Sequence, residues 1–184
     1  GLGDVYKRQA LGLFDPYSVE ASISRLPYVR SYTPADVSSS SVPASSIVTY
    51  RFNPSKLNDS KVKFTWMDGG LRPSQPDQIK EDIGVGGILI YGEKGIISCN
   101  DYGTRAKLYI DGEVVETGQF DGIPSNSFNH YTSWVEAMVD GYGSDKHKNL
   151  NSGFDVAGPI SEVVLLGNVA VRSGLLKRSP RSNV

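Results

Sequence analysis

An aromatic ring, a carboxylate and a guanidinium occur close together in the segment WMDGGLRP, at Trp66, Asp68 and Arg72. An aromatic face can stack on a sugar ring, and the two charged groups can hydrogen-bond to hydroxyls. The segment follows directly on a stretch with strand-like alternation, so these side chains would lie in a loop at a strand end, where binding residues are common. The interpretation is a loop that contacts a polyol. The alternative is a packed tryptophan followed by ordinary turn residues.

A second candidate pair, His130 and Trp134, is separated by one turn of a predicted helix. Residues four apart lie on the same helix face, so a ligand could meet an imidazole and an aromatic ring together. The alternative is an ordinary histidine at the start of a helix. The pattern assigns no catalytic, cofactor-binding or metal-ligating residue.

Alternating apolar and polar residues, rich in β-branched and aromatic types, predict the strands that would carry the first group. The pair Asp111-Gly112 is the strongest hairpin signal in the chain. The predicted strands are residues 18–25, 46–52, 61–67, 86–91, 95–99, 107–110 and 113–117. Tight turns between successive strands favour antiparallel pairing.

The helix that would carry the second group is predicted over residues 127–140, with Ser127 as its N-cap and Gly141 as its stop. Aromatic and aliphatic residues recur along it at helical spacing, which indicates an amphipathic helix. Residues 143–152 are polar and are predicted to form a loop.

Residues 153–174 predict the longest helix. Asp155 or Gly158 would be the N-cap, Pro159 would be the first helical residue, and Gly174 would end the helix. The segment is apolar around most of its circumference, so we expect the whole helix to be buried.

Length and composition bound the remaining possibilities. A chain of 184 residues with 39% hydrophobic content suits a single domain. A net charge of −1 gives no electrostatic case for nucleic acid, and no apolar run is long enough for a membrane span. The single cysteine, Cys99, argues against a disulfide framework and a structural zinc site, and we expect it to be a buried apolar residue.

Clustered strands followed by two late helices predict an α+β fold: an open, mainly antiparallel β-sheet with helices packed on one face. The other face would be solvated or covered by another protein surface. Residues 1–9 contain DVYKRQ, which looks like a translated library adaptor and is excluded from the fold. The domain is expected over residues 10–176, and residues 177–184 are unassigned.

Three segments together resemble the C-terminal domain of the Gfo/Idh/MocA oxidoreductase family, in its bacterial branch. They are WMDGGLRP, GILIYGEKG and GFDVAGPISEVVLLGNVAVRSG, within a resemblance that covers residues 10–176. The resemblance implies a preceding Rossmann domain that holds NAD or NADP, and an α+β domain whose open sheet face makes a homo-oligomer contact. It also implies a sugar or cyclic polyol as the substrate.

The family's nucleotide-binding glycine motif and its lysine-bearing EKP motif have no counterpart here, and its catalytic Asp and His would fall just before residue 10. Asp4 is no substitute for them. We therefore expect a substrate-binding and oligomerisation domain that holds no cofactor itself and is inactive alone. The alternatives are an NAD-dependent glycoside hydrolase of the same family and a non-catalytic carbohydrate-binding module.

Overall fold

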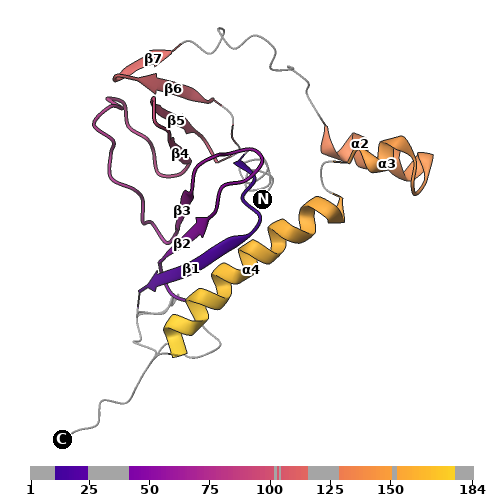
Figure 1. Cartoon of the computed structure of the whole chain (residues 1–184), viewed down its shortest axis with the longest axis horizontal. Coiled ribbons are helices and arrows are strands. Elements are labelled where there is room, and N and C mark those ends of the chain that lie inside the picture. Colours follow the sequence, from indigo (N-terminus) through magenta and orange to yellow (C-terminus); the bar gives the residue numbers. More distant parts are fainter. Residues whose placement is uncertain are drawn as a thin grey trace, which may run out of the picture.

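The computed structural model describes residues 11–24, 42–101, 103, 105–115, 129–150 and 153–176. Within these residues the chain has an α+β fold, as predicted, with seven strands and three helices (Figure 1). The strands are β1 (Pro16–Ile23), β2 (Ser46–Phe52), β3 (Val62–Met67), β4 (Ile88–Tyr91), β5 (Ile96–Cys99), β6 (Lys107–Ile110) and β7 (Glu113–Val115). The helices are α2 (His130–Asp140), α3 (Asp145–Lys148) and α4 (Phe154–Leu176).

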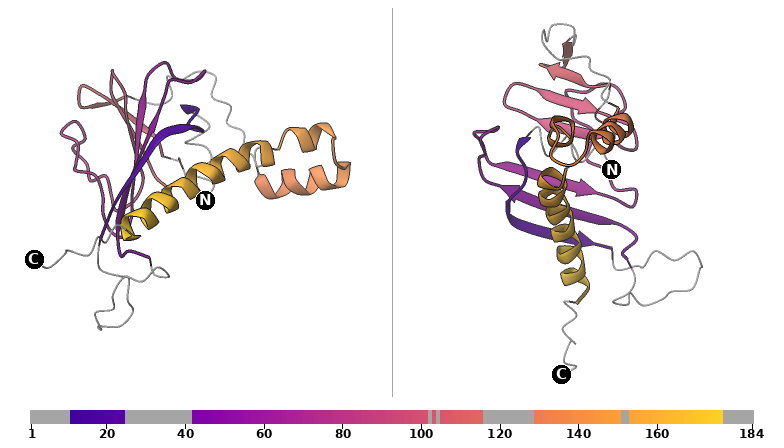
Figure 2. Two further views of the ribbon diagram at one scale, coloured as in Figure 1. Left: turned by 60° about the horizontal axis from the view of Figure 1, so that its bottom comes forward. Right: turned by 90° about the vertical axis from the view of Figure 1, so that its right-hand side faces the viewer.

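The first sheet has the order β1-β2-β3, with both ladders antiparallel. Val19 pairs with Tyr50, and Tyr50 pairs with Phe64, so these three side chains form one row across the sheet. Successive residues of a strand point to opposite faces, which places the apolar members of all three strands on the same side. Helix α4 lies across that side, as both views of Figure 2 show.

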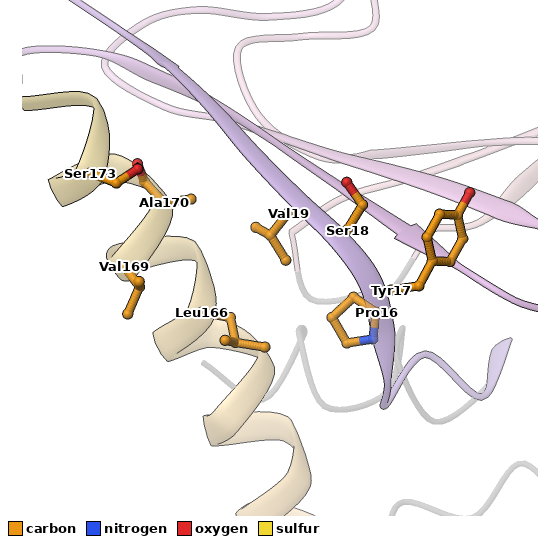
Figure 3. Close-up of a pocket in the computed structure, with 8 residues that line it drawn as sticks. All are labelled: Pro16, Tyr17, Ser18, Val19, Leu166, Val169, Ala170 and Ser173. Carbon is orange, nitrogen blue, oxygen red and sulfur yellow. The ribbon is translucent and has the colours of Figure 1, made fainter. Parts of the chain in front are cut away.

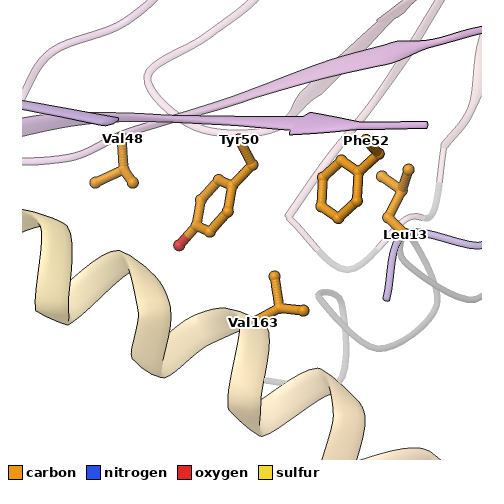
Figure 4. Packing of buried hydrophobic residues seen from close by; sticks show 5 residues of the cluster. All are labelled: Leu13, Val48, Tyr50, Phe52 and Val163. Atoms are coloured by element: carbon orange, nitrogen blue, oxygen red, sulfur yellow. The ribbon is translucent and has the colours of Figure 1, made fainter. Parts of the chain in front are cut away.

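The main core lies between this sheet and α4. Figure 4 shows Val163 of α4 pointing toward the apolar row of β2. The rings of Tyr50 and Phe64 are 5.7 Å apart between centroids, which adds an aromatic contact to the burial. The buried members of this cluster are Leu13, Val48, Tyr50, Phe52 and Val163.

Helix α4 approaches the sheet closely at Gly167. A Cβ at this position would overlap the hydroxyl of Tyr50 and lie 3.6 Å from a methyl of Val48. Glycine is a poor helix former, but here it lets the helix backbone rest directly on the tyrosine. The glycine inside LLGNVA is therefore explained by packing.

The prediction that the last helix is buried on all sides was wrong. Ile160, Val163 and Gly167 are buried on the face toward the sheet, whereas Leu165 and Val169 are about 60% exposed. A three-stranded sheet can cover only one stripe of a helix, because the helix is about 10 Å wide and touches the sheet along a line.

The predicted limits of this helix were also wrong. It begins at Phe154, so Asp155 and Gly158 are helical residues and not N-caps. Pro159 is the sixth helical residue, beyond the first turn that suits proline, and it withholds a hydrogen bond from the Asp155 carbonyl. Gly174 does not stop the helix, which continues to Leu176.

The second sheet has the order β4-β5-β6-β7 and is antiparallel throughout. The predicted strands thus form two sheets instead of one. Asp111 and Gly112 adopt φ of 52° and 83°, the positive values that a two-residue hairpin turn requires, and this confirms the hairpin. Cys99, expected to be buried, is half-buried in β5. Ile79, from the segment after β3, packs against Ile96 and Tyr109 to form a small second core.

Helices α2 and α3 form an arm that projects from the start of α4, away from both sheets (Figures 1 and 2). Gly141 ends α2, as predicted. The N-cap is Asn129 and not Ser127, which lies outside the described residues; the Asn129 Oδ1 accepts hydrogen bonds from the backbone N–H groups of Tyr131 and Thr132. The expectation of a loop over residues 143–152 was wrong in part, since α3 forms there with Ser144 as its N-cap.

Candidate functional site

Asp68 stands where β3 ends, and its carboxylate joins that end to the start of β2. Its Oδ1 accepts from the Ser46 N–H at 2.6 Å, and its Oδ2 accepts from the Ser46 hydroxyl at 2.7 Å. In return the Asp68 N–H donates to the Ser46 carbonyl at 3.1 Å. Ser46 is buried, so this exchange satisfies polar groups that water does not reach. Both carboxylate oxygens accept a hydrogen bond from Ser46, so the main role of Asp68 is to connect two strands of the sheet.

The glycines that follow Asp68 have different roles. Gly69 has a φ of 65°, and a Cβ there would overlap the Ala44 carbonyl oxygen and lie 2.5 Å from the Ser45 Cα. Gly70 also has a positive φ, 85°, but no atom lies within 4 Å of its Cβ position. The backbone of residues 44 and 45 therefore packs against Gly69 alone, and this contact fixes the path of the loop.

Trp66 and Arg72 are the members of this group that face solvent. Trp66 is 41% exposed and pairs across the sheet with Val48, on the side where α4 lies. Arg72 is exposed, and its Nη1 donates to the Gly84 carbonyl at 3.2 Å. That bond ties the two ends of the segment 72–84 together. A guanidinium has five N–H donors, so donors remain for a ligand.

His130 and Trp134 do not join this group. His130 is the first residue of α2, and its side chain lies outside the described part of the structure. Trp134 is 55% exposed on α2. Helix α2 packs mainly on α3 and stands clear of β3 in Figures 1 and 2. The five predicted residues therefore occupy two separate places.

A polar cluster that the sequence did not reveal lies on the second sheet. Lys107 donates from Nζ to both oxygens of Glu81, at 2.8 and 2.7 Å, and the hydroxyl of the buried Tyr109 donates to Oε1 of the same carboxylate. Lys107 and Tyr109 share one face of β6, while Glu81 comes from the segment after β3. The alternation along β6 could be predicted from the sequence, but the contact of Glu81 with this strand could not.

The cluster shifts the pKa values of its three members. The hydrogen bonds from Lys107 and then from Tyr109 lower the pKa of Glu81, and the hydrogen bond to Glu81 raises the pKa of Lys107. Burial, followed by the hydrogen bond to Glu81, raises the pKa of Tyr109. The cluster holds the Glu81 carboxylate in place, because the hydrogen bonds from Lys107 and Tyr109 both favour the ionised form of Glu81.

We expect this carboxylate to make stability depend on pH. Because the pKa of Glu81 is lower in the folded state, its contribution is complete above its ordinary value of 4.5 and is lost as the pH falls through the folded pKa. Urea unfolding of the wild type and of Glu81→Gln should differ at pH 7, and the difference should shrink as the pH is lowered below 4.5.

The matched control for this pH prediction is Glu113→Gln. Glu113 forms a 3.7 Å pair with Lys80 in which both side chains are at least 80% exposed, so its removal should have little effect at either pH. A gap between the wild type and Glu81→Gln that stays constant with pH would contradict the role given to the ionised Glu81.

A shallow groove of about 350 Å³ lies between β1 and α4 (Figure 3). Val19 of β1 points across it toward the helix. The groove is lined by Pro16, Tyr17, Ser18, Val19, Leu166, Val169, Ala170 and Ser173. No carboxylate or cationic side chain lines it, so it suits apolar contact better than acid–base chemistry.

Within the described residues, no three His, Cys, Asp or Glu side chains gather in a way that would hold a metal ion. Among the described helices, none has the length and apolar character that crossing a membrane demands. Comparison with models of protein families and with curated proteins finds no match to this chain.

Proposed function

We propose that this chain is the substrate-binding and oligomerisation domain of an NAD(P)-dependent oxidoreductase of the Gfo/Idh/MocA type, acting on a sugar or a cyclic polyol. The observation that carries the proposal is the strand-end turn in WMDGGLRP. Asp68 and Gly69 fix the turn, and fixing it leaves an aromatic ring and a guanidinium exposed on either side. A rigid turn that presents these groups is suited to stacking on a ring and donating to hydroxyls.

The arrangement of the other two segments is consistent with this proposal. GILIYGEKG forms β4 and its hairpin turn, and GFDVAGPISEVVLLGNVAVRSG forms the helix that covers the first sheet. Each segment that carries the resemblance thus forms a defined element of the fold: a strand-end turn, a hairpin or a helix. Gly167, for example, lets the helix backbone pack directly on Tyr50.

The described residues do not fit the nicotinamide cofactor itself. The glycine-rich stretch 84–87 leads into a strand, β4, whereas a pyrophosphate needs the N-terminus of a helix. A Cβ on Gly86 would lie 3.0 Å from the carboxylate of Asp101, so an acidic group stands beside the glycines and opposes an anion. In this proposal NAD or NADP and the acid–base group belong to a separate domain, and this chain supplies a wall of the substrate pocket.

The proposal assigns the homo-oligomer contact to the sheet face opposite α4. By strand alternation this face carries Glu20, Thr49 and Arg51. Arg51 pairs with Glu20 at 2.6 Å, and their side chains are 37% and 64% exposed. The face is polar and leaves β-sheet surface accessible, which suits a contact made largely by hydrogen bonds and ion pairs.

The test is a titration with monosaccharides and cyclic polyols, followed by calorimetry. We expect binding that Trp66→Ala weakens about tenfold, the effect of losing one stacked aromatic contact. Trp134→Ala removes the chain's other tryptophan and should leave the affinity unchanged. NADH should show no stoichiometric binding to this chain. Polyol binding that ignores Trp66→Ala, or specific binding of NADH, would refute the proposal.

A further inference from the structure

Helix α2 carries an apolar stripe that faces solvent. Tyr131, Trp134, Val135 and Met138 follow the spacing of one helix face, and Val139 borders them. All five are between 52% and 82% exposed. An amphipathic helix normally turns this face toward a core. We call these five residues the arm stripe.

Helix α3 packs on the other side of α2. Ala137 is buried there, and Lys146 of α3 lies 3.7 Å from Glu136 and 3.4 Å from Asp140. The polar side of α2 is therefore the side that contacts α3. Its two carboxylates have a cation close by, so they do not place an uncompensated negative charge beside the stripe.

The arm stripe is large for a surface that stays in water. Large aromatic side chains cover 150–250 Å² and aliphatic ones less, so two aromatic and three aliphatic side chains, each more than half exposed, leave on the order of 600 Å² in water. Monomeric proteins rarely leave apolar patches above a few hundred Å² uncovered. The area is close to the roughly 800 Å² that one partner contributes to a standard protein interface.

We propose that two copies of this chain form a dimer through the arm stripe, a contact separate from the one assigned above to the sheet face, with their α2 helices packed antiparallel about a two-fold axis. A two-fold contact sets the same patch against itself, so one stripe of this size is sufficient for both partners. Helix α2 spans about 16 Å, which allows its four spaced side chains to interdigitate with their copies. The arm projects away from both sheets (Figure 2), which leaves it accessible to the arm of a second copy.

Sedimentation velocity over a range of concentrations tests the dimer. We expect Met138→Glu to raise the dimer dissociation constant at least a hundredfold, because it places a charge in the middle of the apolar contact. The matched control is Val85→Glu, which adds the same charge at an apolar side chain that is 95% exposed and lies outside both the arm and the sheet face opposite α4. It should leave the arm dimer intact. A wild-type chain that stays monomeric at 100 µM, a dimer that Met138→Glu leaves intact, or a dimer that Val85→Glu weakens as much as Met138→Glu does, would overturn the proposal.

A second readout follows the stripe directly. In a Trp66→Phe background, Trp134 is the only tryptophan, and its emission should shift to shorter wavelength as the concentration passes through the dissociation constant. Emission that does not depend on concentration while the chain dimerises would place the contact elsewhere and refute the proposal. Both measurements are independent of the polyol titration, so the dimer and the proposed function can fail separately.

Discussion

Replacing Gly69 by alanine should lower the free energy of unfolding by about 3 kcal/mol or more. Gly69 has a φ of 65°, which costs an alanine roughly 1–2 kcal/mol. The new methyl would also overlap the Ala44 carbonyl oxygen, and crowding of this kind costs about 1–3 kcal/mol more. The obstacle is backbone, so a change of rotamer cannot relieve it. The loop or the start of β2 has to move, and the bonds between Asp68 and Ser46 lengthen with it.

The matched control is Gly70→Ala, one residue further on. Gly70 also has a positive φ, so alanine pays a similar conformational cost, but its Cβ would meet no atom within 4 Å. Chemical denaturation of the two variants separates the close approach from the backbone conformation. Equal losses would show that the contact between Gly69 and residues 44 and 45 contributes nothing.

Only part of the structure of WMDGGLRP could be predicted from the sequence. Two adjacent glycines after a strand predict a turn, and the turn is present. The partner of Asp68 was not predictable, because Ser46 is 22 residues away and meets it only through the pairing of β2 with β3. A carboxylate interpreted as a ligand group proves to bond to the backbone and the hydroxyl of a neighbouring strand.

Local signals were sufficient to locate the strands, although β1 starts two residues before its predicted limit and β4 two residues after it. Asp111-Gly112 favours a two-residue hairpin turn without any distant contact, and β6 and β7 pair on either side of it. The same holds for β2, whose predicted limits, residues 46–52, agree with the structure. Strand alternation depends on which face is buried, and this chain keeps a strict alternation along β2.

Contacts across loops were beyond the sequence. Glu81 reaches Lys107 over 26 residues, and Arg72 reaches Gly84 over 12, in a segment without periodicity. The separation of Trp134 from Trp66 has a similar origin, since it depends on the direction in which the arm leaves α4 (Figure 1). The composition of α2 and α4 showed that they are apolar, but it could not show how much of each helix the rest of the protein covers.

Adjacent valines in α4 give the sharpest test of how this helix is covered. Val163 is 0% exposed and belongs to the core, whereas Val164 is 42% exposed. An aspartate at 163 would be buried without a cation, and we expect Val163→Asp to cost at least about 4 kcal/mol, a large part of the 5–15 kcal/mol that stabilises a typical domain. Val164→Asp should cost about 1 kcal/mol or less, because its charge reaches water. Both variants place the same residue in the same helix, so their helix propensities cancel in the comparison. Severe and equal losses in urea unfolding would mean that α4 is enclosed on both sides, as its composition alone suggested, and that the sheet is only one of the surfaces covering it.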